Sequence, residues 1–317
     1  MKRYLLPPEG NLYKANLHCH STVSDGDFSP AQIKDFYKRR GYHAVAFTDH
    51  QVCLPHPELN EADFVALTGI EIAYGIRKST SIHACGISRN PETALQHPNT
   101  IENDIGKLNE GIRFLNSKNF ITTLNHPRWS GISAADIAAI QGFANMEVIN
   151  GYELMVDGYG DSSACFEEAL RAGRKILPLA ADDSHHASAP GCPGYEFFQG
   201  FTVLKAPCLS YESLSTALDT GAFFASTGPM IENLWLEDGI LHLECSPVRG
   251  VYVHGHLYRH RASKVVSSDT ITQLDLDIGN TFADADYLFV KIMDTHGRSA
   301  WACPAWLNQH RKEDCYV

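Results

Sequence analysis

The sequence predicts an α/β protein in which a parallel sheet wrapped by helices is followed by a smaller antiparallel β-domain. Short aliphatic runs alternate with helical patterns through the first two thirds of the chain, as expected for helices packed around parallel strands. After residues 226–229 the pattern changes to closely spaced segments of period two, separated by turn residues. A chain of 317 residues with 44% hydrophobic content can bury a core for both parts. We therefore expect domains at residues 1–227 and 228–317.

The first helix is marked most clearly. Ser29 can cap it, Pro30 suits its first position, and Gly41 ends it before a strand at residues 44–47. Further expected elements are a helix over residues 100–118, a helix capped by Ser133 with Asp136, a helix over 166–170 capped by Asp161, and a strand over 175–180. In the second domain, residues 251–253, 274–276 and 288–292 fit antiparallel strands with one buried face.

Histidines and carboxylates recur where strands end. His18 and His20 are two residues apart, so in a strand they share one face and can direct two imidazoles at one metal ion. Residues of the same chemistry follow along the chain in Asp25, Asp49-His50, Glu71, His83, His126 and Asp182-Asp183-Ser184-His185. In a barrel of parallel strands, residues at the strand ends converge although they are distant in sequence. The pattern predicts a single metal site.

This series of motifs resembles the PHP superfamily, the polymerase and histidinol phosphatase group of metal-dependent hydrolases, over about residues 12 to 227. The resemblance implies a distorted (β/α)7 TIM-like barrel with two or three divalent metal ions at its mouth. It assigns His18, His20, Glu71 and Asp183 to a first site, Glu71 with His83 and His126 to a second, and Asp25, His50 and His185 to a third.

Two positions in this assignment need separate attention. A carboxylate at Asp25, where some relatives have histidine, makes the third site more favourable for Mn or Fe than for Zn, so the metal is expected to be Mn, Fe or Zn. Either Asp182 or Asp183 could be the ligand, and the spacing to His185 on a strand favours Asp183. Asp182 and Asp49 are then expected beside the ligands, where they orient them.

The expected activity is that of a multinuclear metal-dependent hydrolase, most simply a phosphoesterase acting on a small phosphomonoester or phosphodiester through a metal-bridging hydroxide. Arg128 and Asp49 are the candidate catalytic residues, with Arg128 as a phosphate or carboxylate clamp. An ordinary surface arginine is the alternative for Arg128. Trp129 can stack on a substrate ring or pack under its loop, and residues 186–200 can form a lid or a plain crossing loop.

Two other functions remain open. The C-terminal segment 300–306 resembles the ending of a PHP branch that includes carbamate-hydrolysing enzymes, so hydrolysis of a carbamate, ester or amide is an alternative. A non-catalytic binding module is the second alternative, although the family's ligand positions are all filled by metal-competent residues. His254, His256 and His260 have no nearby carboxylate motif and are interpreted as surface or strand-face residues.

The composition restricts the kinds of molecule that the protein is expected to bind. The formal net charge of −11 argues against a general nucleic-acid-binding surface, so a nucleic acid is expected only as a nucleotide or short oligonucleotide substrate. Nine cysteines without CxxC pairs are typical of reduced thiols, and no segment resembles a signal peptide or membrane span. We expect a cytoplasmic protein with a small phosphorylated substrate and no membrane partner.

Overall fold

A mixed sheet runs through the whole molecule. The computed structural model describes residues 2–74, 81–98, 104–186, 194–257 and 260–307. In order of pairing, the strands are β1 (Lys2–Tyr4), β13 (Ile231–Glu237), β14 (Ile240–Leu257), β16 (Tyr287–Met293), β17 (Ser299–Ala302), β12 (Phe223–Ser226), β11 (Phe201–Ala206), β2 (Asn11–Asn16), β3 (Ala44–Phe47), β5 (Val65–Tyr74), β6 (Ile82–Ser88), β8 (Phe120–Leu124), β9 (Asn145–Asn150) and β10 (Leu177–Ala181). Beside this path, β15 (His260–Asp277) pairs with β14 and β18 (Ala305–Trp306) with β16, while β4 (Val52–Cys53) and β7 (Leu95–Gln96) form a separate pair.

Strand direction decides which ends meet. β2, β3 and β5 are parallel to one another, and so are β8, β9 and β10. Between these two sets, β6 is antiparallel to both β5 and β8, so the two sets run in the same direction. The carboxyl ends of both sets therefore lie at one edge of the sheet, and the amino end of β6 lies at that same edge.

No ladder among the described strands closes the sheet, so the predicted closed (β/α)7 barrel is not shown. Beyond the ends of β2 and β10, an isolated parallel bridge joins Cys19 to Ser184, where the His20 amide donates to the Ser184 carbonyl and the Asp183 amide to the His18 carbonyl, both at 2.9 Å. Between β10 and β11, the Thr202 hydroxyl accepts from the Ala180 amide at 3.2 Å and donates to the Ala180 carbonyl at 3.0 Å. The coarser prediction of an α/β fold is confirmed.

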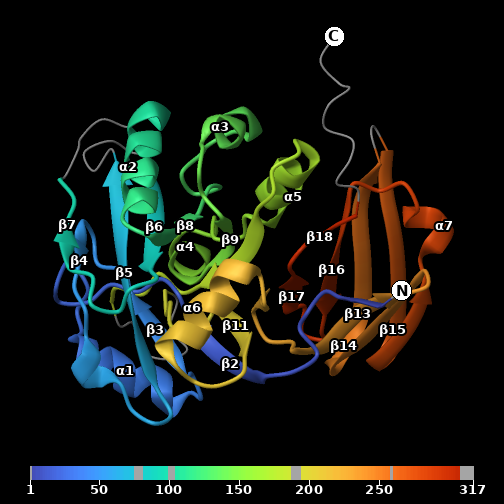
Figure 1. Ribbon diagram of the computed structural model, residues 1–317, viewed down its shortest axis with the longest axis horizontal. Coiled ribbons are helices and arrows are strands. Elements are labelled where there is room, and N and C mark those ends of the chain that lie inside the picture. Colours follow the sequence, from blue (N-terminus) through green and yellow to red (C-terminus); the bar gives the residue numbers. More distant parts are fainter. Residues whose placement is uncertain (1, 75–80, 99–103, 187–193, 258–259, 308–317) are drawn as a thin grey trace.

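Helices lie along the outside of the first part of the sheet (Figure 1). Their bounds are α1 (Pro30–Arg39), η1 (Pro57–Leu59), α2 (Ile105–Ser117), α3 (Ala134–Ala139), α4 (Gly151–Val156), α5 (Ser163–Arg171) and α6 (Tyr211–Thr220), while α7 (Gly279–Phe282) lies beside the C-terminal strands β14 and β15. Ser29 caps α1 in a capping box with Gln32, and Ser133 caps α3 with Asp136, as predicted. The start of α2 falls at the Asp104 cap, and α5 follows Ser162, one residue after the expected cap Asp161.

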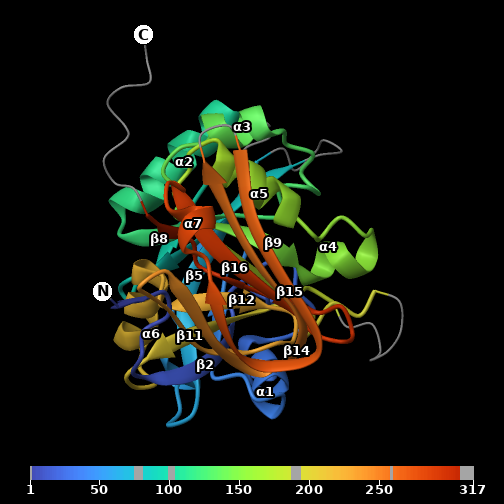
Figure 2. The ribbon, with the colours of Figure 1, turned by 90° about the vertical axis from the view of Figure 1, so that its right-hand side faces the viewer.

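The C-terminal strands are antiparallel, as predicted from their period-two pattern. Figure 2 looks onto β14 and β15, which form a long hairpin in front of the first part of the molecule. The N-terminal strand β1 also pairs here, with β13, and β17 pairs with β12 of the preceding part. The division at residues 227 and 228 stays a prediction, because the sheet continues across it.

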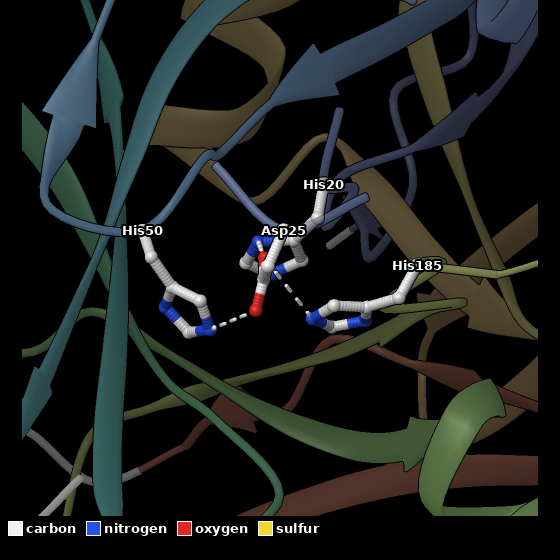
Figure 3. Close-up of side chains that lie close together, drawn as sticks. All are labelled: His20, Asp25, His50 and His185. Carbon is white, nitrogen blue, oxygen red and sulfur yellow. Dashed lines mark ion pairs between the residues drawn. The ribbon is translucent and has the colours of Figure 1, made fainter. Parts of the chain in front are cut away.

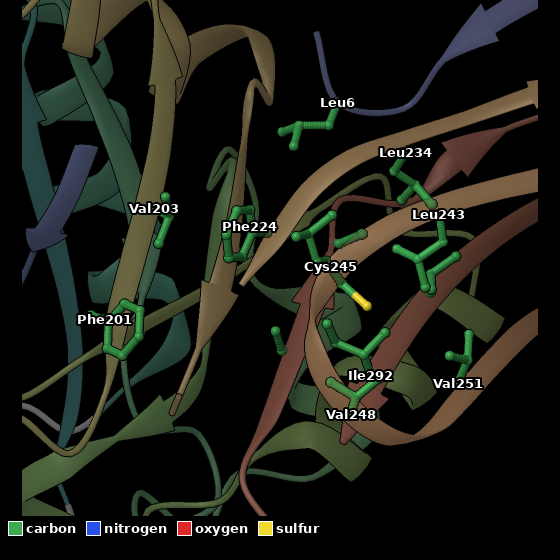
Figure 4. Packing of buried hydrophobic residues seen from close by; sticks show 14 of the residues in the cluster. Leu6, Phe201, Val203, Phe224, Leu234, Leu243, Cys245, Val248, Val251 and Ile292 are labelled. Carbon is green, nitrogen blue, oxygen red and sulfur yellow. The ribbon is translucent and has the colours of Figure 1, made fainter. Parts of the chain in front are cut away.

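A hydrophobic cluster joins the two parts (Figure 4). Phe201, Val203 and Phe224 of β11 and β12 belong to the same buried cluster as Leu243 and Ile292 of β14 and β16. Burial of this apolar surface supplies the main stabilising free energy of such a contact. The sheet edge that carries the polar residues is thus held on a packed scaffold.

Candidate metal centre

The predicted ligands meet at the edge where the two parallel sets of strands end. His18 and His20 follow β2, His50 follows β3, His126 follows β8, and Asp183 and His185 follow β10, while Glu71 lies within β5. His83 is the second residue of β6. Since β6 runs opposite to its neighbours, its beginning lies beside their ends, and this places His83 with the others.

The nine side chains form three overlapping groups, in each of which the candidate ligand atoms lie within 4.8 Å of one another. The groups are His18, His20, Glu71 and Asp183; Glu71, His83 and His126; and His20, Asp25, His50 and His185. Glu71 belongs to the first two groups, and His20 to the first and third. Each group offers the imidazole and carboxylate donors that divalent transition metals prefer.

The first group is the most deeply buried. The Nε2 atom of His18 lies 3.0 Å from Oδ1 of Asp183 and 3.2 Å from Oε1 of Glu71. The Nε2 atom of His20 lies 3.2 Å from Oδ1 of Asp183 and 3.2 Å from Oε2 of Glu71. None of the four residues is more than 4% exposed. Two carboxylates and two imidazoles therefore converge on one point that is shielded from solvent.

Two buried oxygens in this group have no hydrogen-bond partner among the described residues. They are Oε2 of Glu71 and Oδ1 of Asp183, and Nδ1 of His50 is unsatisfied in the same way. A buried polar atom without a partner costs free energy, and a buried carboxylate costs more than a neutral group. A divalent cation between these atoms would satisfy them, so the residues fit the metal that the sequence predicts.

Charge coupling within the cluster is strong. Burial alone would lower the pKa of His20, but the carboxylates of Asp183 and Glu71 outweigh it and raise that pKa to about 10. Burial alone would raise the pKa of Glu71, but the surrounding histidines, His83 first, hold it well below its usual range. The carboxylates thus favour positive charge at this point, supplied by protons or by a cation.

The second and third groups extend from the first in different directions. In the second, Oε1 of Glu71 lies 3.1 Å from Nδ1 of His83 and 3.7 Å from Nε2 of His126. In the third, Asp25 lies between three imidazoles (Figure 3). Its carboxylate oxygens lie 3.5 to 3.8 Å from nitrogens of His20, His50 and His185. The Asp25 side chain is 53% exposed, so the third group faces solvent.

Glu147 supports the cluster and was missed by sequence reasoning. It lies in β9 and is 1% exposed. One carboxylate oxygen lies 2.7 Å from Nδ1 of His18, and the other accepts from the His126 amide and from the Asn150 side chain, both at 2.9 Å. A carboxylate on Nδ1 leaves Nε2 of His18 free to act as a ligand and fixes the ring. The available signal was an acidic residue inside the apolar strand 145–150.

Asp49 holds the chain segment that carries Asp25. Its carboxylate accepts from the amide and hydroxyl of Ser21 and from the amide and hydroxyl of Ser24, at 2.8 to 3.1 Å. Asp49 is outside the three groups of candidate ligands. Its contacts therefore suit a role in positioning the ligands, and a catalytic role for Asp49 stays a prediction.

Gly26 allows the same segment to fold tightly. A Cβ atom at this position would lie 2.4 Å from the carbonyl oxygen of His20, far inside van der Waals contact. We expect Gly26→Ala to displace Asp25 and to lower the metal content of the purified protein, measured by elemental analysis. Gly279→Ala, whose Cβ would meet its nearest atom at 3.5 Å, is the control and is expected to bind metal normally. Equal metal content in both variants would contradict this role of the segment.

Of the two neighbouring aspartates, Asp183 faces the cluster. Its Oδ1 atom contacts His18 and His20, and its Oδ2 atom accepts from Asn150 at 2.9 Å. Asp182 instead accepts from the amides of residues 198–200 and from the Tyr37 hydroxyl. Asp183 has a φ of 54°, a left-handed conformation that aspartate tolerates better than most residues.

Arg128 lies outside the groups of candidate ligands and is exposed. Its guanidinium donates to the Asp161 carbonyl at 3.2 Å and lies over the Tyr159 ring at 5.5 Å. The clamp role of Arg128 stays a prediction. Trp129 packs against the candidate ligands, since its ring centroid lies 4.8 Å from that of His126 and 5.9 Å from that of His83.

Two further sequence expectations concern the remaining histidines and the 186–200 segment. His254 contacts Arg261 and belongs to none of the groups of possible metal ligands among the described residues, and the side chain of His260 lies outside those residues. Residues 187–193 also lie outside them, so the lid stays a prediction. Glu196, beyond this stretch, is 2% exposed and accepts from the His185 amide at 2.6 Å and from the His186 amide.

Comparison with known proteins places similar chains among metal-dependent hydrolases. No family model matches this chain. A segment is 36% identical over 75 residues to a 5'-3' exoribonuclease of Haemophilus influenzae, covering 23% of this chain and 26% of that protein. The match thus spans about a quarter of the length of that relative.

Solved structures are similar over longer stretches at low identity. A two-domain protein from Bacteroides vulgatus containing a predicted PHP-like metal-dependent phosphoesterase is 16% identical, with 92% of this chain and 93% of that chain covered and a TM-score of 0.48. A putative metal-dependent phosphoesterase from Bifidobacterium adolescentis is 14% identical, with 59% of this chain and 93% of that chain covered and a TM-score of 0.38. An amidohydrolase from Chromobacterium violaceum with bound sulfate and no metal is 14% identical, with 66% of this chain and 96% of that chain covered and a TM-score of 0.42. The first of these descriptions names the family that the sequence motifs resemble.

The sequence predicts no membrane span. Among the described residues, the helices are all too short or too polar to cross a membrane.

Proposed function

We propose that this protein is a multinuclear metal-dependent hydrolase, in which two or three divalent ions are held by the three groups described above. The observation that carries the proposal is the sharing of Glu71 between the first two groups, together with the unsatisfied oxygens of Glu71 and Asp183. The two oxygens of one carboxylate can each bind a cation, so a shared glutamate holds two cations close together. When bound, such cations lower the pKa of coordinated water and polarise an ester or carbonyl oxygen.

The protein's own residues that prepare this chemistry lie at different depths below the surface. Glu71 and Asp183 supply buried negative charge, and Glu147 with Asn150 orients His18 and Asp183. Asp25, the exposed carboxylate, is the candidate ligand nearest to an arriving substrate. Its oxygen donor makes the third group harder in ligand character and favours Mn or Fe there over Zn.

We propose a small phosphomonoester or phosphodiester as the substrate. The net charge of −11 opposes a nucleic-acid surface, and a phosphoryl group held by metal ions needs no extended basic surface. Arg128 is proposed as a clamp for the phosphate or carboxylate group of the substrate. A cytoplasmic location is proposed with this activity, on the cysteine pattern of the sequence.

Hydrolysis of a carbamate, ester or amide is the second candidate, and one observation favours it. A cavity of about 710 Å³ opens beside Asp25, His50 and His83, and its described lining holds no lysine or arginine. Phosphate sites commonly add such cations to the metals. A panel of chromogenic phosphate and carboxyl esters, assayed with added Mn, Fe or Zn, separates the two candidates.

His20→Ala tests whether the cluster is a working metal centre. Because His20 belongs to two groups, its removal is expected to abolish turnover and most bound metal while the circular dichroism spectrum is retained. The control is His296→Ala, since that side chain is 74% exposed in the C-terminal domain. Full metal content and activity in His20→Ala would refute the assignment, and metal without turnover of any ester in the wild type would favour a binding module.

A further inference from the structure

A cavity lies beside the third group and is lined by Asp25, His50 and His83 together with residues that are not candidate ligands. Its far wall comes from β4 and β7, the separate pair of strands in which Val52 lies opposite Gln96. Ala73 of β5 and Ser81 before β6 close its base. At about 710 Å³ it falls within the size range of pockets for organic ligands and exceeds what a phosphoryl group needs. The cavity can therefore hold the part of a substrate that does not react.

The polar groups of this wall are neutral. They are the amides of Gln51 and Gln96, the hydroxyls of Ser24 and Ser81, and the imidazole of His97. Burial lowers the pKa of His97, and its ring nitrogens face the Pro98 carbonyl at 3.0 Å and the Tyr74 hydroxyl at 3.5 Å, so this imidazole is uncharged at neutral pH. Besides Asp25 and the imidazoles of His50, His83 and His97, the described lining holds no acidic or basic side chain, and no lysine or arginine is part of it.

Gln51 supplies an unsatisfied acceptor in this wall. It is 5% exposed, with a φ of 61°, and its backbone joins three strands because its amide donates to Glu71 and its carbonyl accepts from the His97 amide, both at 2.8 Å. Its side-chain nitrogen donates to the Ala73 carbonyl at 2.8 Å, while Oε1 has no hydrogen-bond partner among the described residues. The Oε1 atom is itself buried, so a hydroxyl or amide N–H of a ligand could reach it only after the Gln51 side chain turns toward the cavity.

We propose that this cavity binds the non-reacting part of the substrate and selects a neutral group that carries hydroxyl or amide donors, against one that carries a second anion. This inference rests on the proposed function for the position of the reacting group. A second phosphate in the cavity would lose its hydration without meeting a cation of the described lining, and it would approach Asp25 in a protein of net charge −11. Hydroxyl groups would instead exchange water for the amides and hydroxyls of the wall.

The test compares glucose 6-phosphate with glucose 1,6-bisphosphate, which differ only in a second phosphate. For the wild type with added Mn, we expect kcat/KM for the monophosphate to exceed that for the bisphosphate about tenfold or more. Gln96→Lys, which adds a cation on the exposed strand β7, is expected to reduce or reverse this ratio. Gln273→Lys on exposed β15 makes the same charge change away from the cavity and should leave the ratio unchanged.

Equilibrium binding gives a readout that does not depend on turnover. If neither sugar phosphate is hydrolysed, isothermal titration calorimetry of the same pair is expected to show tighter binding of the monophosphate, and the proposed phosphoesterase function fails while the cavity assignment stands. Preference for the bisphosphate, by rate or by affinity, overturns the inference and indicates a cation outside the described residues, where Arg77 and Lys78 are found. An equal shift in the Gln96→Lys and Gln273→Lys variants, or binding of neither compound, also overturns it.

Discussion

Replacement of Glu71 by glutamine is expected to remove most of the bound metal and to reduce turnover at least about 100-fold, because this one carboxylate is shared by two of the three groups. The substitution changes neither side-chain size nor shape appreciably. It removes the negative charge that faces His18, His20 and His83 and replaces one acceptor oxygen by a donor. Metal content measured by elemental analysis and turnover measured with a chromogenic ester check the two expectations separately.

Glu232→Gln is the matched control for this variant. Glu232 lies in β13 and is exposed, so the same chemical change there should alter neither metal content nor turnover. A Glu71→Gln protein that retains the wild-type number of metal ions would show that the first two groups do not share a bridging ligand. Retained metal with lost turnover would restrict Glu71 to the reaction itself.

Replacement of Asp182 by alanine is expected to lower the free energy of unfolding by roughly 4 kcal/mol, a large fraction of the stability of a typical domain. Asp182 is fully buried and accepts hydrogen bonds from the amides of Phe198, Gln199 and Gly200 at 2.7 to 2.9 Å. The Tyr37 hydroxyl donates to it as well, at 2.8 Å. Alanine would leave the three backbone amides without this acceptor, while the Tyr37 hydroxyl would keep Ser184 Oγ, at 3.0 Å, as an acceptor.

Urea denaturation at pH 8 in the presence of a chelator measures this effect without a contribution from bound metal. Burial raises the pKa of Asp182 to about 6, against the opposing backbone hydrogen bonds, so the carboxylate is ionised at pH 8. Asp284→Ala, at an exposed position, should change stability by no more than about 0.5 kcal/mol. A similarly small loss in Asp182→Ala would mean that water replaces the carboxylate in this network.

The two variants are expected to affect different properties of the protein. Glu71→Gln is expected to affect metal and turnover, and Asp182→Ala to affect stability first, although Asp183 next to it faces the metal cluster. Consecutive residues at the end of a strand direct their side chains to opposite sides, and Asp182 and Asp183 accordingly have different hydrogen-bond partners. A defect in metal binding in Asp182→Ala would therefore arise through the backbone of β10 and its following loop.

Local patterns were enough to predict much of the fold. Ser29 and Pro30 at the start of α1, and Ser133 with Asp136 at the start of α3, predicted helix ends because capping depends on residues close in sequence. The antiparallel strands of the second part followed from alternation of period two. The absence of a closed ladder among the described strands did not follow, since the contacts of β10 with β2 and β11 depend on how distant strands approach each other.

The sequence by itself determined the chemistry of the centre: which imidazoles and carboxylates are available, and that His18 and His20 share a face, because strand geometry fixes the direction of residues two apart. Only the tertiary structure decided which of them meet. The reversed direction of β6 brings His83 to the cluster, the left-handed backbone turns Asp183 inward, and Glu147 reaches His18 across the sheet. These contacts join residues that are far apart along the chain, and their geometry depends on strand direction and packing, which local sequence patterns do not encode.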